Sequence, residues 1–356
     1  MDDLETKLAW HVPYLTTELP GVGGVIRTEV KDFVVDEVPA YEPSGEGEHV
    51  YLRVEKRNVS TIQLIQEVAQ KLDISSRVIG SAGLKDTHAI ARQTLSVHGV
   101  SVEAVEALQL DQARILWVKR HRNKLRAGHL RGNRFTVRIW GVVRDADTRA
   151  AAILHRLRVR GVPNAYGPQR FGNRGDNQIL GYYLLHDDQE RLASHGVHHL
   201  SRRLRHLFVS ALQSALFNQV LAARIEAGTM DTVIQGDVAK KETTGGIFTV
   251  EDVTAERPRA ADWEISATGP IYGYKMLEAK DAAGVLEAQV LARAGLTLDS
   301  FRSVRARGLR RPLRYNPEDA THRMDEEGHL IVEFFAPKGA FATVLLEELM
   351  KTGDVR

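Results

Sequence analysis

The chain has 356 residues, of which 43% are hydrophobic and 26% are charged, and its formal net charge at pH 7 is +2. This length suffices for two or three domains, and the composition is ordinary for a globular protein. The absence of cysteine excludes disulfides, thiolate nucleophiles and cysteine-ligated zinc or iron–sulfur sites. No segment approaches the roughly 18 apolar residues that cross a bilayer, and the N-terminus lacks a secretory signal, so we expect a cytoplasmic protein.

The first part of the chain predicts an α+β region. Residues 24–27, 33–38 and 49–55 have the alternating pattern of strands. Residues 61–72 carry apolar side chains at helical spacing, and Asn58 or Ser60 is placed to cap this helix.

A glycine-led turn follows this helix. Gly80 and Gly83 separate it from an alternating segment at 94–97, which predicts that Asp86 lies on a loop at the edge of a sheet. Loops held by rigid elements often carry chemistry, so Asp86 is a candidate catalytic carboxylate. The alternative is that Lys85 and Asp86 form a solvated charge pair, and spacing alone does not decide between the two.

Further along, the elements suggest one domain interrupted by another. The chain next predicts a helix at 102–110, strands at 115–118 and 135–143, and a helix at 148–160 ended by Gly161. Turns rich in glycine and asparagine then precede a helix at 200–227 and a glycine-rich segment at 228–274. Strands return at 313–315 and 329–335, with a helix at 340–350, so the pattern predicts a sheet domain with an insertion.

Positive charge is concentrated in acid-free runs. No acidic residue lies between Asp111 and Asp145, where there are ten basic residues, and a second acid-free run lies between Asp299 and Glu318. One run alone is compatible with a solvated face, but two indicate a positive surface for a polyanion. Nucleic acid fits better than a membrane, because residues 119–129 lack an apolar face. The expected contacts are Lys119, Arg120, Arg122, Lys124, Arg126 and Arg131.

Aromatic and histidine residues give weaker signals. Phe135 and Phe171 lie near glycines and arginines, so each is either a core ring or a ring that stacks on an unpaired base, whereas Trp140 is more typical of a core. No histidine spacing matches a metal site, and the chain has neither a phosphate-binding P-loop nor a serine-hydrolase elbow. We therefore expect no metal.

Along nearly its whole length, the chain resembles the TruD family of tRNA pseudouridine synthases. The motifs occur in the family's order, and a complete ordered series is far more specific than any single motif. They are Phe33-Val-Val-Asp-Glu37, Gly45-Glu-Gly-Glu-His49, Gly83-Leu-Lys-Asp86 with Ala89 and Gln93, Lys124-Leu-Arg126 with Gly128, Gly132-Asn133-Arg-Phe135, the stretch from Val162 to Gly172, Ala215-Leu-Phe-Asn218, Gly236-Asp237 and Pro337 to Thr343.

The resemblance implies isomerisation of uridine to pseudouridine in tRNA, with position 13 as the usual family target and without a metal or organic cofactor. Asp86 would attack the ribose at C1′ or otherwise assist cleavage of the glycosidic bond, and a nearby cation would favour its ionised form. The resemblance places Arg27 as the basic partner and Phe135 as the ring that stacks on a base taken out of its helix. The other expected active-site residues are Phe33, Lys85, Asn133, Gln169, Arg170 and Phe171.

The family also implies a fold and a domain division. The fold expected is α+β: a pseudouridine synthase core with a mixed, mostly antiparallel sheet and flanking helices, formed by residues 1–160 and 309–356. The insertion at 161–308 would be an α/β TRUD domain, with RNA held in the cleft between the two.

Some positions depart from the family pattern. Arg27 stands where lysine is familiar, Ala165 and Tyr166 stand where an aromatic pair is usual, and Glu347 stands where arginine is usual. The arginine preserves the charge but changes its geometry. Contacts made from the other positions are therefore expected to differ, and none of these changes touches Asp86.

Two other functional classes fit parts of the sequence. A non-catalytic RNA-binding protein would explain the basic runs and Phe135 but would not need Asp86. A sugar-acting hydrolase would use Asp86 with a second carboxylate, for which Glu37 is the nearest motif candidate, and would release free uracil.

Overall fold

The computed structural model describes residues 3–353, and its largest feature is a nine-stranded sheet. The main order is β14-β15-β7-β2-β5-β3-β6, with β1 beside β7 and β4 beside β5. These strands are β14 (Thr321–Met324), β15 (Leu330–Pro337), β7 (Leu130–Val142), β2 (Phe33–Pro39), β5 (Ile90–His98), β3 (His49–Arg57), β6 (Ala113–His121), β1 (Gly23–Val25) and β4 (Gly80–Ser81).

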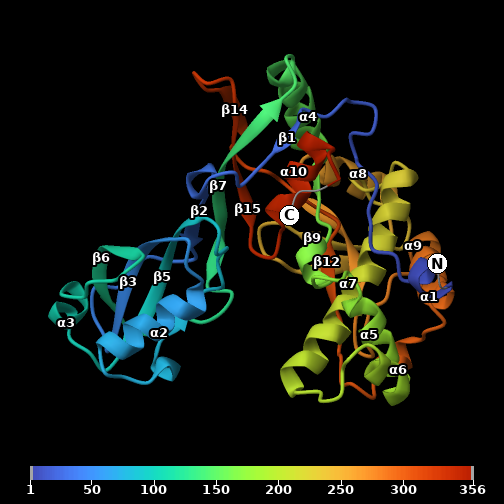
Figure 1. The fold of residues 1–356 in the computed structure, drawn as a ribbon. Coiled ribbons are helices and arrows are strands. Elements are labelled where there is room, and N and C mark those ends of the chain that lie inside the picture. The colour runs from blue at the N-terminus through green and yellow to red at the C-terminus, as the bar shows by residue number, and fades with distance from the viewer. Residues whose placement is uncertain (1–2, 354–356) are drawn as a thin grey trace.

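This sheet is mixed and mostly antiparallel, as expected. Within residues 3–353, only the β2–β5 pair of this sheet is parallel. The long strand β7 pairs with both β2 and β15, and it therefore joins the early strands to those formed near the C-terminus. Figure 1 shows β7 and β15 running between the early strands on the left and the helices on the right.

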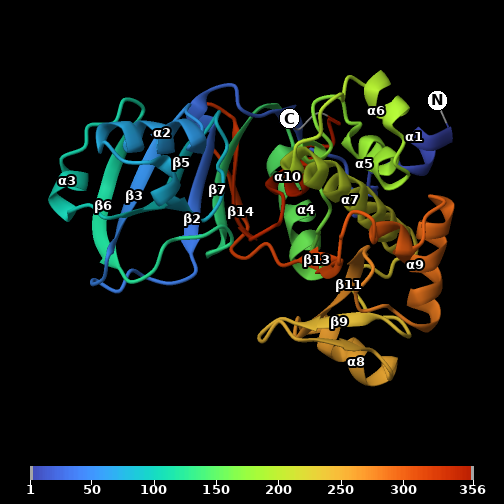
Figure 2. The ribbon, with the colours of Figure 1, turned by 90° about the horizontal axis from the view of Figure 1, so that it is seen from below.

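Helices flank the sheet. The best-defined cap is that of α2 (Thr61–Lys71): Ser60 accepts from the Gln63 amide, and the Gln63 side chain reaches back to the Ser60 amide, which closes a capping box. The other helical segments of this part are η1 (Val30–Asp32), η2 (Ser76–Val78), α3 (Val102–Glu106), α4 (Ala146–Arg160) and α10 (Ala342–Met350). Figure 2 shows α2 against the early strands, and α4 and α10 near the middle of the molecule, between the large sheet and α7.

The middle of the chain forms a second, smaller sheet with its own helices. The four-stranded order is β10-β9-β11-β12, and a separate pair joins β8 to β13. The strands are β8 (Val162–Pro163), β9 (Val238–Lys241), β10 (Ile247–Thr249), β11 (Ile265–Ile271), β12 (Leu309–Pro312) and β13 (Arg314–Tyr315). The helices are α5 (Asn177–Leu185), α6 (Gln189–Ser194), α7 (Arg202–Glu226), α8 (Val253–Ala261), α9 (Asp281–Arg293), η3 (Pro168–Arg170) and η4 (Leu298–Phe301).

Packing links the ends of the chain to this middle part. Helix α1 (Asp3–Lys7) is followed by Leu8, which is fully buried in a cluster with residues of α5, α7 and α9. Strand β12 extends the smaller sheet to Pro312. Leu8 and residues 309–312 therefore pack with the middle part, although the predicted division assigns both to the other domain. The division at 160 and 308 remains a prediction.

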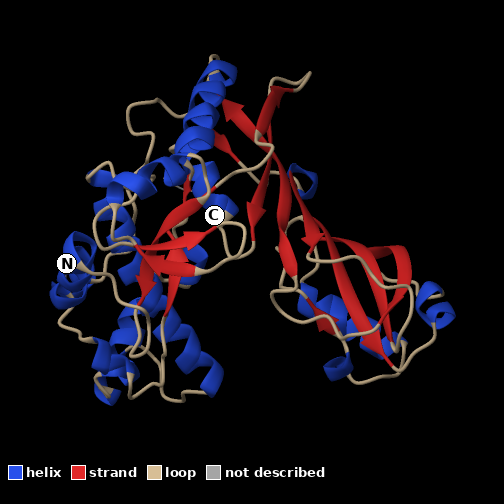
Figure 3. Ribbon diagram, turned by 180° about the vertical axis from the view of Figure 1, so that it is seen from behind, coloured by secondary structure: helices blue, strands red, loops and turns tan. Residues whose placement is uncertain are grey.

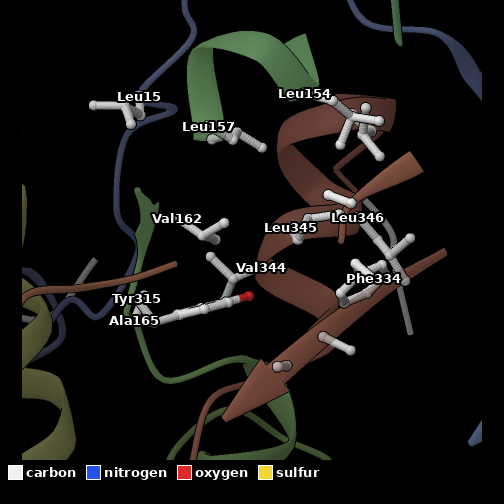
Figure 4. Packing of buried hydrophobic residues seen from close by; sticks show 14 of the residues in the cluster. Leu15, Leu154, Leu157, Val162, Ala165, Tyr315, Phe334, Val344, Leu345 and Leu346 are labelled. Atoms are coloured by element: carbon white, nitrogen blue, oxygen red, sulfur yellow. The ribbon is translucent and has the colours of Figure 1, made fainter. Parts of the chain in front are cut away.

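The largest hydrophobic cluster lies where the two sheets approach each other. Leu154 and Leu157 of α4 pack toward Leu345 and Leu346 of α10, with Tyr315 of β13 nearby, as Figure 4 shows. Burial of apolar area stabilises a fold by about 25 cal/mol per Å². Because this cluster contains side chains from both sheets, its burial stabilises the contact between the large sheet and the insertion.

One sequence interpretation, that of the glycine-rich segment, needs correction. The glycine-rich segment at 228–274 contains β9, β10, α8 and β11, and all seven residues of β11 are buried. The sequence of this strand contains Ser266, Thr268 and the Gly269-Pro270 pair, which are typical of a turn and explain why the pattern did not indicate a buried strand. Seen from behind in Figure 3, this smaller sheet lies among the helices.

No helix within residues 3–353 has the length and apolar character needed to cross a membrane.

Candidate active site

Asp86 lies on the loop between β4 and β5, which confirms its predicted position on a loop beside a sheet. The Lys85 amide donates to the Thr61 hydroxyl at 3.0 Å, and this bond fixes the loop to the first residue of α2. The Asp86 side chain is 39% exposed. A carboxylate on an anchored loop that solvent still reaches is suitably placed to meet a substrate.

Arg27 is the cation that faces Asp86. Its Nη2 donates to Asp86 Oδ1 at 3.2 Å, and its guanidinium lies 4.4 Å from the centre of the Phe33 ring. The Arg27 backbone has φ of 61°, a left-handed conformation that is sterically unfavourable for residues other than glycine. Such strain persists only where the surroundings hold it, and it is common at functional sites. The predicted partnership of Arg27 with Asp86 is present.

Lys85 points away from Asp86 despite being next to it in sequence. Its Nζ lies 2.8 Å from Glu37 Oε2 and donates to Asn133 Oδ1 at 2.7 Å. Lys85 and Glu37 are both buried. The pair therefore joins β2, β7 and the Asp86 loop, and removal of either partner would leave a costly unpaired charge.

Lys56 is a site residue that the sequence analysis missed. Its side chain is fully buried, and its Nζ donates to the carbonyl oxygens of Asp86 at 2.5 Å and Val59 at 2.7 Å. Burial lowers the pKa of Lys56 to about 8. Side chains two residues apart in a strand point to the same face. Lys56 is therefore on the same face of β3 as Leu52 and Val54, and this spacing could have indicated that its side chain is buried.

Phe33 and Phe135 form a ring cluster beside the ion pair. Their centroids lie 5.9 Å apart in an edge arrangement, and Phe135 stacks on Phe334 at 5.3 Å. Phe135 is paired with Val35 of β2 across the sheet and is only 6% exposed. Phe135 is therefore nearly buried between Phe33 and Phe334, and its predicted stacking on the target base stays a prediction.

Gln169, Arg170 and Phe171 lie on and just after η3, outside the Asp86 cluster. Gln169 is exposed, and the Arg170 guanidinium lies 5.1 Å from the Tyr166 ring centre. Phe171 is fully buried and stacks on Trp10 at 4.4 Å. The expectation that Phe171 offers a ring to an unpaired base is therefore wrong for this conformation, because another ring already covers it.

Residues 112–144 contain no acid, but several of their arginines have carboxylate partners in the folded structure. Arg122 pairs with Glu46, and Arg131 approaches Glu318 at 3.9 Å. Arg114, Arg134 and Arg138 also have carboxylate partners from distant parts of the chain. Acid-free spacing does not detect partners that the fold brings in. Lys119, Arg120 and Arg126 are exposed, while Lys124 donates to the Arg77 carbonyl.

A polar hollow of about 860 Å³ lies between the end of the large sheet and the smaller sheet. Arg311 and Arg314 line it, and both are held by backbone carbonyls and by aromatic rings. In residues 3–353 no carboxylate lies within salt-bridge distance of either guanidinium. The other lining residues include Arg131, Lys240, Glu242, Trp263, Arg310, Tyr315, Glu318 and Lys338.

Metal ligands do not gather in the described part of the chain. Residues 3–353 contain no group of three or more histidine, aspartate or glutamate side chains placed to hold a metal ion.

Comparison with known proteins gives a consistent result. A family model described as tRNA pseudouridine synthase D (TruD) matches residues 10–195 and 189–349. A tRNA pseudouridine synthase D from Geobacter metallireducens is 40% identical over 96% of this chain and 98% of its own length. A protein of the same name from Thermus thermophilus is 45% identical over 95% of this chain and 92% of its own length.

A solved structure has the same fold. The crystal structure of the putative tRNA pseudouridine synthase D from Methanosarcina mazei superposes with a TM-score of 0.80, at 23% identity and with 99% of each chain covered. The two-part family match and the extent of the curated matches account for the full order of motifs seen in the sequence. The chain belongs to the TruD family of tRNA pseudouridine synthases.

Proposed function

We propose that this protein isomerises uridine to pseudouridine in tRNA, at position 13, with Asp86 as the catalytic carboxylate. The observation that carries the assignment is the Asp86–Arg27 pair, in which a partly exposed carboxylate on an anchored loop faces a guanidinium beside the Phe33 ring. Family membership supports the reaction class.

The reaction balances without any added reagent. Asp86 attacks C1′ as the glycosidic C1′–N1 bond breaks, and the electron pair leaves with uracil. The uracil then turns, C5 bonds to C1′, and the carboxylate is released. The proton lost from C5 is balanced by one gained at N1. An elimination path from the ribose would use the same carboxylate as a base, and the proposal for Asp86 includes both paths.

Hydrolysis is a weaker candidate because the second carboxylate is occupied. Glu37 is 3% exposed, accepts from the Thr94 amide at 3.0 Å and pairs with Lys85 at 2.8 Å. A glycosidase-type mechanism needs a second carboxyl group that is free to exchange a proton near the bond. Glu37 instead acts as a structural partner of Lys85.

The polar hollow supplies a surface for the tRNA backbone. Six basic residues line the hollow against two acids, Glu242 and Glu318. Burial lowers the pKa of Arg314 only to about 10, so it stays charged at neutral pH. A lining in which cations outnumber acids attracts a phosphate backbone. We place this reaction in the cytoplasm, with tRNA as the partner.

The test is modification of an unmodified tRNA transcript by purified protein, with pseudouridine mapped by position. Wild type should modify position 13, and Asp86→Asn should reduce the rate by at least about a thousand-fold. Asp36→Asn is the matched control, because Asp36 is 38% exposed and also pairs with an arginine, Arg53. Full modification by Asp86→Asn would refute the catalytic assignment, and release of free uracil by wild type would favour hydrolysis.

A further inference from the structure

A second cavity lies on the large sheet, away from the Asp86 cluster. It has a volume of about 220 Å³ and is lined by residues of β2, β3, β5 and β6 and of the loops at residues 41–43 and 125–129. This is smaller than the roughly 300 to 1,000 Å³ of sites for drug-sized ligands. The lining residues are Glu37, Pro39, Tyr41, Glu42, Pro43, Tyr51, Arg53, Thr94, Trp117, Leu125 and His129.

The register shows that this cavity opens on the face opposite Lys56. Tyr51 and Arg53 alternate with Val54 and Lys56 along β3, so they point to the other side of the sheet. Arg53 is paired with Trp117 of β6, which places both on the cavity face. A base in this cavity is therefore not the base that Asp86 would act on.

Aromatic rings dominate the walls. The Tyr41 hydroxyl bonds His129 Nδ1 at 2.8 Å, and the Tyr41 ring stacks on His121 at 5.1 Å. The Tyr51 hydroxyl donates to the Asn123 carbonyl at 2.9 Å. Tyr41 nevertheless remains 37% exposed. The rings are thus fixed by polar contacts at their edges, and one of them is still open to solvent.

The surroundings of the cavity carry positive charge. Lys119 Nζ lies 5.5 Å from the centre of the Trp117 ring, and Lys119 is paired with Tyr51 across the strands. Leu125 lines the cavity between Lys124 and the exposed Arg126. Glu42 is an exposed acid in the lining, whereas Glu37 is neutralised by Lys85. The cations are those of the basic run that we expect to contact RNA.

From these observations we infer that the cavity binds one unpaired base of the bound tRNA, distinct from the target uridine. A base offers a flat ring for Tyr41 and Trp117, its phosphate meets Lys119, and the volume suits a single ring system. This inference rests on the proposed function, since it takes tRNA as the partner.

Glu37 connects this base site to the reaction site. Its carboxylate lies 2.8 Å from Lys85 on one side and 3.7 Å from Arg53, a wall of the cavity, on the other. Lys85 in turn immediately precedes Asp86. A base seated against Arg53 is therefore two side chains from the loop that holds the catalytic carboxylate.

The test is a double-mutant cycle between protein and RNA. A set of tRNA transcripts, each with one unpaired nucleotide other than the target made abasic, is titrated against the full-length protein. For wild type, one abasic position should weaken binding by about 5- to 100-fold, the range expected for loss of one base–ring stack. Tyr41→Ala should weaken binding of intact tRNA similarly and remove the sensitivity at that position. Tyr182→Ala, a partly exposed tyrosine of α5 far from the cavity, should match wild type.

Trp117 gives a second readout that does not depend on Tyr41→Ala folding. The difference in tryptophan fluorescence between wild type and Trp117→Phe should be quenched by intact tRNA and not by the transcript abasic at the sensitive position. Equal binding by Tyr41→Ala and wild type, no sensitive position in wild type, or quenching by every transcript would each overturn the inference. Pseudouridine is also mapped on the intact tRNA. If the protein modifies this tRNA but no abasic position weakens binding, the inference about the cavity is refuted and the proposed function is not.

Discussion

The Asp86 cluster and the polar hollow differ in how their charges are balanced. Around Asp86 each cation has a defined partner: Arg27 faces the carboxylate, Lys85 faces Glu37, and Lys56 is held by two carbonyls. In the hollow, Arg311 and Arg314 are held by carbonyls and rings and have no carboxylate partner in residues 3–353.

This contrast matches two different tasks. A reacting carboxylate must be held within a fraction of an ångström, so its surroundings gain from paired charges and fixed hydrogen bonds. A surface for a phosphate backbone gains from positive charge that the protein itself does not neutralise. Lysine and arginine side chains therefore hold the reacting group in position in the Asp86 cluster, and they attract the RNA backbone in the hollow.

After Asp86→Asn, the largest expected effect comes from Lys56→Met, which tests whether the Asp86 loop depends on the buried Lys56 amine. The variant keeps the side-chain volume but leaves the Asp86 and Val59 carbonyls without their donor. We expect the turnover rate on the tRNA transcript to fall by about 100-fold, because a small misplacement of a reacting group has effects of that size.

Lys71→Met is the matched control for this variant. Lys71 is a partly exposed lysine of α2 that pairs with Glu67 and Asp111, and exposed pairs contribute little. Wild-type turnover by Lys56→Met, in a protein that is folded by circular dichroism, would show that the loop holds its position without the amine.

A smaller effect is expected from Lys240→Gln, which probes the hollow. Loss of one phosphate contact should weaken tRNA binding about 3- to 10-fold at low salt and reduce the slope of log affinity against log salt by about one. Filter binding across a salt series measures both quantities. An unchanged salt slope would mean that Lys240 does not meet the RNA backbone, and the hollow would then lose one of its assigned cations.

The last prediction concerns stability alone and Glu347, which belongs to neither region. Burial, together with the nearby Glu348, raises the pKa of Glu347 to about 7 from 4.5. Between these pH values the folded protein binds a proton that the unfolded chain has lost, so the free energy of unfolding decreases as pH rises from about 4.5 to about 7. Glu347→Gln should remove this decline and be more stable than wild type at pH 8 by on the order of 1 to 2 kcal/mol.

Urea unfolding at pH 5 and pH 8 measures this difference, with Glu278→Gln as the control because Glu278 is exposed. The control should match wild type at both pH values, whereas Glu347→Gln should gain its advantage at pH 8, where Glu347 must carry its charge in a buried place. A stability difference between Glu347→Gln and wild type that is the same at both pH values would contradict the raised pKa.

Much of the fold was predictable from local pattern. The periodicity predicted α2, β3 and the long helix α7 close to their observed bounds, and Ser60 is the cap that the sequence offered. The clearest failure is β11: all seven of its residues are buried, yet Ser266, Thr268 and the Gly269-Pro270 pair are typical of an exposed turn.

The site was predicted in part. Motif order identified Asp86, and the resemblance identified Arg27 as its partner, which the structure brings within 3.2 Å. Phe171 was misjudged because nothing near it in sequence indicates Trp10, the ring that covers it. Lys56 was missed because a lysine near the end of a strand is usually exposed, and the carbonyl groups of Val59 and Asp86 that accept from it are known only from the structure.

By itself, the sequence determined the elements with a clear period, such as α2, β3 and α7, together with the ordered motifs and the family, because these depend on residue type and spacing along the chain. Only the tertiary structure decided which charges are compensated: Lys85 turns to Glu37 instead of Asp86, and half of the first basic run acquires acids from distant segments. The physical reason is that charge pairing depends on distance in space, and residues such as Arg134 and Asp319 meet only after the sheet has formed.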